Sequence, residues 1–305
     1  MNVLVTGGAG FIGSHLVDAL VERGDSVRVL DDLSNGRAEN VNPAAQLFEG
    51  DVADHELAQH AVDGVEIVFH QAALGSVKRS IENPLATHHA NLDGSLSMLQ
   101  AARRAGVRRF VAASSSSVYG GAAPLPSRED FPSSPRSPYA VTKAAMEQYC
   151  RVYHELLGLE TVCLRYFNVF GPRQRHDSEY AAVVPLFVTA LRNRQRPTIF
   201  GDGQQRRDFT FVTDVVRANL LASTAATTDC GGHVYNVAGG QQHTVLDLLH
   251  QIADLVGVDA DPVYADPRPG EIRDSAADLT AAGRDLGFVP EYSLEDGLAV
   301  LVRGS

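Results

Sequence analysis

Short apolar runs alternate with amphipathic stretches over the first half of the chain. The run 3–5 precedes a glycine cluster, and residues 11–23 then carry apolar side chains at 12, 16, 17, 20 and 21. This pattern is typical of a buried strand followed by an amphipathic helix. Similar strand-like runs follow at 27–30, 67–69, 110–113 and 161–164. Such alternation predicts an α/β fold with a parallel sheet, helices on both faces and ligands at the carboxyl ends of the strands.

The alternation of apolar runs with amphipathic stretches ends at about residue 170. Turn-forming stretches at 171–173 and 201–203 separate shorter elements there, which predicts a smaller α/β C-terminal lobe. We expect residues 1–170 to form the larger domain and residues 171–305 the smaller lobe, with some segments returning to the first domain. No internal repeat or flexible linker separates the two, so we expect a cleft between them to hold the functional site.

Composition narrows the class of protein. The chain has 305 residues, of which 44% are apolar, and its net charge is −11 without a long basic run. This charge argues against nucleic acid as a partner. Three widely separated cysteines (Cys150, Cys163 and Cys230) form no set with metal-ligand spacing, so we expect no structural metal and a reducing, cytoplasmic location. The chain has no apolar run of 18 residues, so we expect no membrane-spanning segment.

A glycine-rich turn follows the first predicted strand. Gly8, Gly10 and Gly13 match G-x-G-x-x-G, and Asp31 stands 18 residues after Gly13 at the end of the second predicted strand. This context favours a Rossmann-type, doubly wound dinucleotide site, in which the pyrophosphate meets the helix N-terminus. The carboxylate of Asp31 would accept hydrogen bonds from ribose hydroxyls and repel a 2′-phosphate. The predicted cofactor is therefore NAD rather than NADP.

Tyr139 and Lys143 are one helical turn apart, directly after Ser137 and Pro138. Proline suits the first turn of a helix, so both side chains are expected on one face. A nearby ammonium and a positive nicotinamide ring would favour the phenolate, which could accept a proton from a sugar hydroxyl. The Y-x-x-x-K pattern also occurs by chance on surface helices, but Lys143 is one of only two lysines among 26 basic residues. Hydroxyl residues at 114–117 directly follow an apolar run.

These motifs resemble those of the extended short-chain dehydrogenase/reductase family, in particular its nucleotide-sugar 4-epimerases of the UDP-hexose type. The resemblance extends nearly end to end. The matching segments are residues 6–13, 31–36, 50–52, 69–73, 91, 115–120, 139–143, 165–168, 207–208 and 268–271.

The resemblance implies an isomerase in which tightly held NAD⁺ accepts hydride from C4 of the sugar, the 4-keto sugar turns over, and the hydride returns to the opposite face. Ser115 would hydrogen-bond the reacting O4, Tyr139 would be the base and Lys143 would tune the pKa of Tyr139. Binding strength should then lie in the nucleotide and diphosphate rather than in the sugar.

The resemblance also implies two sets of binding residues. Positions that match cofactor contacts are Gly7, Gly10, Phe11, Ile12, Gly13, Asp31, Asp32, Ser34, Asn35, Gly36, Asp51, Val52, Gln71, Ala72, Ala73, Asn91, Tyr139, Lys143 and Tyr166. Positions that match UDP-sugar contacts are Gly75, Ser115, Tyr139, Asn168, Ala182, Val183, Arg207, Arg268 and Ser275. Asn168 and the two arginines would bind the diphosphate. A homodimer is the family's expectation, and apolar stripes on the helix from Tyr139 and on residues 92–105 could form its interface or simply pack in the core.

Two short segments bear on the reaction and the substrate. Ser116 and Ser117 stand where related dehydratases and decarboxylases carry acidic residues, which favours epimerisation. Ser275 matches a position that is a bulky tyrosine in epimerases confined to non-acetylated sugars, and Gly75 and Ala182 are small wall residues. The resemblance thus implies UDP-GlcNAc/UDP-GalNAc interconversion, with UDP-Glc/UDP-Gal as further substrates.

Three alternatives remain open from the sequence. Arg273 could face an acidic sugar, which leaves a UDP-glucuronate 4-epimerase as one of them. A dehydratase, decarboxylase or reductase of the same fold is another, and a non-catalytic dinucleotide sensor is the third.

Overall fold

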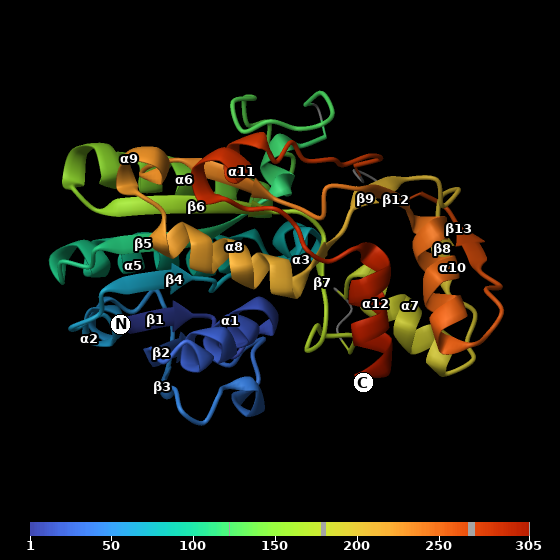
Figure 1. Ribbon diagram of the computed structural model, residues 1–305, viewed down its shortest axis with the longest axis horizontal. Coiled ribbons are helices and arrows are strands. Elements are labelled where there is room, and N and C mark those ends of the chain that lie inside the picture. The colour runs from blue at the N-terminus through green and yellow to red at the C-terminus, as the bar shows by residue number, and fades with distance from the viewer. Residues whose placement is uncertain (122, 178–180, 268–271, 305) are drawn as a thin grey trace.

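A seven-stranded sheet forms the centre of the larger lobe in the computed structural model (Figure 1), which describes residues 1–121, 123–177, 181–267 and 272–304. All its neighbouring strands pair in parallel, in the order β11-β6-β5-β4-β1-β2-β3. The strands are β1 (Asn2–Thr6), β2 (Ser26–Asp31), β3 (Gln46–Glu49), β4 (Ile67–His70), β5 (Arg109–Ser115), β6 (Glu160–Tyr166) and β11 (Val234–Val237). The prediction of a doubly wound parallel sheet is confirmed.

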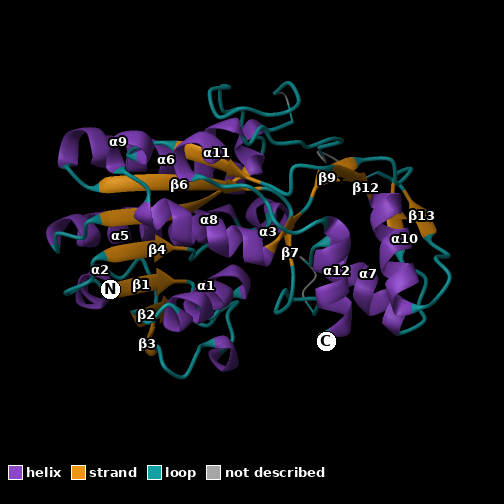
Figure 2. Cartoon of the chain, viewed as in Figure 1, coloured by secondary structure: helices purple, strands orange, loops and turns teal. Residues whose placement is uncertain are grey.

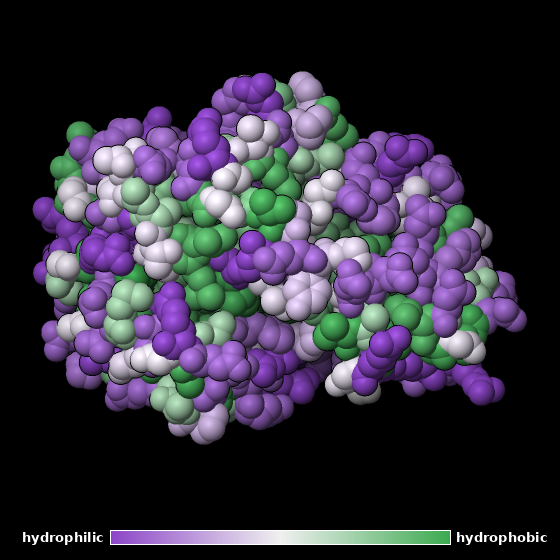
Figure 3. Space-filling model, viewed as in Figure 1, coloured by the Kyte–Doolittle hydropathy of each residue, from purple (hydrophilic) through white to green (hydrophobic). Residues whose placement is uncertain are grey.

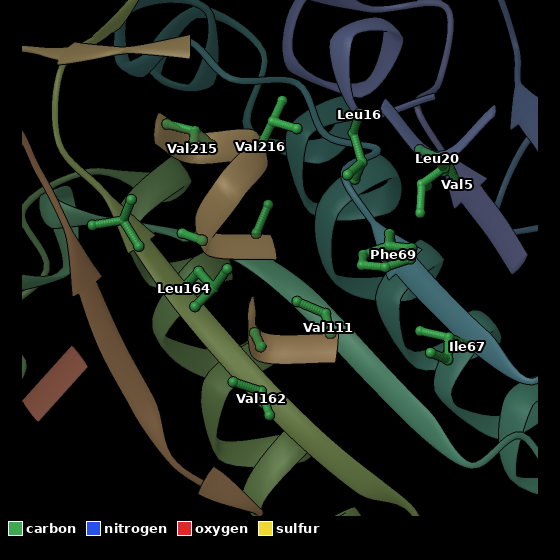
Figure 4. Packing of buried hydrophobic residues seen from close by; sticks show 14 of the residues in the cluster. Val5, Leu16, Leu20, Ile67, Phe69, Val111, Val162, Leu164, Val215 and Val216 are labelled. Atoms are coloured by element: carbon green, nitrogen blue, oxygen red, sulfur yellow. The ribbon is translucent and has the colours of Figure 1, made fainter. Parts of the chain in front are cut away.

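Helices cover both faces of this sheet because the side chains of each strand alternate between the faces. Val5 and Phe69 pack with α1 (Phe11–Glu22) and α8 (Val212–Thr224) on one face (Figure 4). Leu4 and Val68 pack on the other face, with α2 (His55–Ala61), α5 (Gly94–Arg104) and α6 (Pro138–Leu157). Short α9 (Thr227–Cys230) and α11 (Thr280–Leu286) complete the first face, and α3 (Val77–Glu82), α4 (Pro84–His88) and a π-helical turn (His89–Asp93) lead into α5.

Two strands of the sheet were not predicted from the sequence. The edge strand β3 has only two apolar residues, and β11 carries Asn236 at its centre. Asn236 can be fully buried because its side chain is hydrogen-bonded: it accepts from the Tyr119 hydroxyl at 2.8 Å and donates to the Ser127 carbonyl at 2.9 Å. Through β11 and α8, segments after residue 170 join the larger lobe.

The smaller lobe has its own apolar core, formed mainly by α7 (Val183–Arg192), α10 (Val245–Val256) and α12 (Leu294–Arg303) (Figure 2). Short paired strands flank these helices: β7 (Val169–Phe170) with β10 (Thr210–Phe211), β8 (Thr198–Phe200) with β13 (Val263–Ala265), and β9 (Arg206–Asp208) with β12 (Gln242–Thr244).

The surface is largely hydrophilic in the view of Figure 3, with apolar residues scattered across both lobes. None of the helices in the described parts of the chain combines the length and apolar character needed to span a bilayer. Cys150, Cys163 and Cys230 are buried free thiols.

Candidate active site

A cavity of about 1480 Å³ lies at the carboxyl ends of β1 to β6, and residues of α7 and α12 form its far wall. The turns after the strands supply the near wall, which is where a parallel sheet presents its ligand site. Nearly all the residues predicted from the sequence as cofactor or substrate contacts line this cavity. Asn91, Val183, Arg207 and Ser275 are not among its lining residues, and Arg268 lies outside the described residues.

The glycine turn after β1 brings backbone close to backbone. A Cβ atom on Gly13 would lie 2.1 Å from the carbonyl oxygen of Gly7, and one on Gly7 would lie 2.7 Å from the backbone nitrogen of Ala72. Gly7 also has a φ of +68°, which side chains with a Cβ rarely adopt. The turn therefore leaves room at the N-terminus of α1, where unpaired N–H groups attract a pyrophosphate. This cradle fits a dinucleotide.

Asp31 is buried at the end of β2, where its carboxylate orders the next loop. Its two oxygens accept hydrogen bonds from the backbone N–H groups of Ala9 and Leu33, both at 2.9 Å. Burial raises its pKa, which these hydrogen bonds oppose. Each oxygen keeps a further lone pair, so the carboxylate can still accept from ribose hydroxyls.

Asn91 was predicted to contact the cofactor, but the structure buries it beneath the cavity wall with 1% exposure. Its amide oxygen accepts from the Leu74 N–H at 2.7 Å, and its amide nitrogen donates to the Leu74 carbonyl and to Thr142 Oγ1. Asn91 thus ties the loop after β4 to α6. Its predicted contact with the cofactor stays a prediction.

Tyr139 and Lys143 lie on the same face of α6, as predicted. The Ser137 hydroxyl caps this helix by accepting from the Ala140 N–H at 3.2 Å, and Pro138 occupies its first turn. Lys143 Nζ donates to the Ala113 carbonyl of β5 at 2.8 Å. The Ser115 side chain, at the end of the same strand, lies near enough to Tyr139 to lower its pKa. The three predicted catalytic residues therefore meet at the cavity wall.

Burial controls the ionisation of this group. It raises the pKa of Tyr139, while the hydrogen bond with Ser115 lowers it. Burial also lowers the pKa of Lys143 to about 8. In the protein without cofactor, burial outweighs the effect of Ser115 on the pKa of Tyr139. The lowering of this pKa by Lys143 stays a prediction.

Two of the predicted substrate residues, Asn168 and Ser275, are hydrogen-bonded to each other. Asn168, which lines the cavity, donates to the Asp208 carbonyl at 2.9 Å and to Ser275 Oγ at 3.2 Å. Ser275 thus lies behind Asn168. Arg207 on β9 is half-buried and donates to the carbonyls of Arg206 and Arg273.

Sequence reasoning missed several residues of the site. Gln71, Tyr166 and Asn219 form a ring of hydrogen bonds of 2.8 to 3.1 Å behind the cofactor wall, and Asn219 was not singled out. Arg79 and Arg192 also line the cavity. No local motif marked these residues, because they come to the site from helices far apart in sequence. Within the described ranges, no group of three or more His, Cys, Asp or Glu side chains could hold a metal ion.

Comparison with known proteins identifies the family. The profile of the NAD dependent epimerase/dehydratase family matches residues 3–238. The chain belongs to this family. It is 41% identical over 309 residues to a UDP-glucose 4-epimerase of Mycolicibacterium smegmatis, with 99% of this chain and 97% of the relative covered.

Solved structures agree with the family in fold. The crystal structure of a UDP-glucose 4-epimerase from Thermotoga maritima with UDP-glucose has a TM-score of 0.96 at 40% identity, covering 99% of this chain and 98% of that one. A UDP-N-acetylglucosamine 4-epimerase from Methanobrevibacter ruminantium, in complex with UDP-N-acetylmuramic acid, has a TM-score of 0.93 at 40% identity, covering 99% and 97%. The predicted resemblance to the 4-epimerase type of the family is confirmed. The predictions that the protein is an enzyme of this class and that its cofactor is NAD are confirmed as well.

Proposed function

We propose that this member of the NAD dependent epimerase/dehydratase family is a UDP-hexose 4-epimerase, an isomerase that inverts C4 through a transient 4-keto sugar. The observation that carries the proposal is the meeting of Ser115, Tyr139 and Lys143 in one cavity with the glycine turn and Asp31. Its preferred substrates would be UDP-GlcNAc and UDP-GalNAc, with UDP-Glc and UDP-Gal as further ones.

Each catalytic side chain has a distinct task in this proposal. Bound NAD supplies the hydride acceptor and donor and a positive ring that favours the phenolate. Tyr139 accepts the proton of the sugar O4 and later returns it. Ser115 orients O4 through its hydroxyl, and Lys143 holds positive charge beside the phenol.

The hydroxyl stretch supports epimerisation over elimination. A dehydratase or decarboxylase needs an additional acid or base near the sugar. Residues 116 and 117 are both serines here, in the 3-10 turn Ser116–Tyr119 directly after β5. The turn therefore offers hydroxyl groups and no carboxylate.

The choice of sugar rests on small wall residues. Ser275 lies directly behind the cavity-lining Asn168, to which it is hydrogen-bonded, and a serine there leaves volume that a tyrosine would fill. A Cβ atom on Gly75 would meet no atom within 4 Å. The small residues at 75 and 275 therefore support a pocket with room for a 2-acetamido group. Arg273, the candidate for a uronic acid, is exposed and pairs with Asp202 at 3.5 Å, so no specific observation favours an acidic sugar.

We propose a division of binding between the lobes. Residues 1–170, together with α8 and β11, would hold NAD, and the remainder of 171–305 would hold the UDP-sugar. Asn168, Arg207 and Arg268 would bind the diphosphate, since guanidinium groups offer several planar donors to phosphate oxygens. The free buried cysteines support a cytoplasmic setting.

We also propose a homodimer that pairs through α6. This helix buries Met146 and Cys150 against the sheet yet leaves Tyr149, Val152 and Leu156 exposed, the last by 75%. The exposed residues recur at helical spacing along one stripe. A second copy of the same stripe would remove it from water.

The proposed function is tested by incubating the purified protein separately with UDP-GlcNAc, UDP-Glc and UDP-GlcA, without added cofactor. We expect chromatography to resolve the C4 epimer of the first two. Deuterium placed at C4 should remain in the product, because the hydride never leaves the site. A keto sugar as the end product, or loss of the deuterium to solvent, would contradict epimerisation.

A further inference from the structure

Three consecutive residues at the end of β5 contact three residues spaced one turn apart on α6. The Ala113 carbonyl accepts from Lys143, the Ser115 side chain lies beside Tyr139, and the Ser114 hydroxyl donates to Glu147 Oε1 at 2.5 Å. Two of these contacts involve the proposed catalytic residues. The third, made by Glu147, has no assigned role.

Glu147 is 3% exposed and lies one turn beyond Lys143, outside the cavity lining. A buried carboxylate needs a partner. Arg165 of β6 supplies it through two hydrogen bonds, from Nε to Oε1 at 2.8 Å and from Nη2 to Oε2 at 2.7 Å. The guanidinium of Arg165 in turn lies 4.7 Å from the ring centre of Tyr119. Glu147 is therefore fixed from two sides.

We propose that Glu147, held by Arg165, is a positioning residue for the reaction: it locks the end of β5 against α6 and directs a negative charge toward the ammonium group of Lys143. The role of Lys143 rests on the proposed function. A purely structural ion pair would fasten α6 to β6 without affecting Lys143.

The other titratable groups around Lys143 leave Glu147 as the acidic partner. Cys150 faces it from α6, Cys163 from β6 and His70 from β4. The pKa of Cys163 is raised well above its ordinary value by a hydrogen bond with Cys150 and by burial. Burial lowers the pKa of His70 to about 3. Cys163 and His70 are thus neutral near pH 7. Cys163, Cys150 and then Glu147 oppose the lowering of the Lys143 pKa by burial, and Glu147 is the one carboxylate among these three.

The lysine content of the chain allows a direct test. Lys78 and Lys143 are the only lysines, so labelling lysine with ¹³C at Cε gives two NMR signals, which Lys78→Arg assigns. The pKa of Lys143 is then measured by pH titration in the wild-type holoenzyme and in Glu147→Gln. We expect Glu147→Gln to lower this pKa measurably, because it removes a negative charge one helical turn away. The basic limb of the kcat profile should move to lower pH by the same amount.

Glu160→Gln is the matched control. Glu160 pairs with the buried Arg109 at 2.9 Å, and these two residues are register partners at the opposite end of β5 and β6. We expect this variant to lose thermal stability while the Lys143 titration and the kcat profile stay in place. If Glu147→Gln does not fold, the double variant Glu147→Gln/Arg165→Gln avoids an unpaired buried charge. It should lower the pKa by a smaller amount, because loss of the Arg165 charge acts in the opposite direction.

A Lys143 titration that is unchanged in a folded Glu147 variant would overturn the inference. The NMR signal reports on Lys143 whether or not the protein turns over a sugar. Absence of epimerisation by the wild-type enzyme would instead refute the proposed function, so the two failures are distinguishable.

Discussion

The glycine turn gives the sharpest quantitative prediction. In Gly13→Ala, the added Cβ would start 2.1 Å from the Gly7 carbonyl oxygen, whereas real Cβ contacts are essentially never closer than 3.0 Å. The turn and the start of α1 must therefore separate by about 0.9 Å or more. The neighbouring atoms all belong to backbone, so no side-chain rotation can relieve the contact.

That displacement moves the N–H groups that would bind the pyrophosphate. A hydrogen bond to a charged group contributes about 1.5 to 3 kcal/mol. Losing two of them would weaken NAD binding by about 3 to 6 kcal/mol, which is roughly a hundredfold to ten-thousandfold. We expect Gly13→Ala to be purified without NAD and to lack activity until NAD is added in large excess.

The assay is the NAD content of the purified protein, measured by chromatography after denaturation, together with a titration of NAD into the depleted protein. Gly283→Ala is the control. Gly283 lies in α11, and a Cβ there would be in ordinary contact, 3.6 Å from the Phe288 carbonyl. Alanine should stabilise that helix by up to about 1 kcal/mol. Wild-type NAD content in Gly13→Ala would refute the reasoning.

Four further predictions concern the site, the fold and the assembly. Tyr139→Phe should lose most of kcat but keep NAD and UDP-sugar binding, since only the phenol oxygen is removed; near-wild-type turnover would contradict its role. Ser275→Tyr should exclude acetylated sugars and spare UDP-Gal, and equal losses on both would contradict the gatekeeper. Burial lowers the pKa of His70 from 6.5 to about 3, so the unfolded chain takes up a proton at this residue below pH 6.5 and the folded protein does not. The free energy of unfolding therefore falls as the pH drops below 6.5, and the loss from His70 reaches about 2 kcal/mol at pH 5. Thermal unfolding of His70→Gln should therefore change less than wild type between pH 7 and pH 5, and an equal change would refute the assignment. Val152→Glu should yield a monomer by light scattering, and an intact dimer would exclude the α6 interface.

Local chemistry explains why much of this protein could be predicted from its sequence. The first strand, the glycine turn and α1 follow one another within 22 residues, and each is specified by its own residues: apolar runs, glycines that permit close backbone approach, and a 3.6-residue period. Tyr139 and Lys143 share a face because helical spacing alone puts them there. The fold class and the glycine turn needed no long-range information.

Only the tertiary structure decided which residues support the site from behind. Asn91 was predicted as a cofactor contact, yet it is buried and ties a loop to α6. The pairing of Glu147 with Arg165 joins residues 18 positions apart on different elements. Such pairs form because packing brings two polar groups together out of water, and each must then satisfy the other.

The same reason explains β11 and the ionisation of Tyr139. Val-Tyr-Asn-Val becomes a buried strand only because Tyr119 and Ser127 accommodate its asparagine. The pKa of Tyr139 depends on how much water the fold excludes, and no local spacing encodes that quantity. The sequence by itself determined which chemical groups the chain carries and where its local elements begin. Desolvation and long-range pairing, which exist only once the chain is folded, determined how those groups behave.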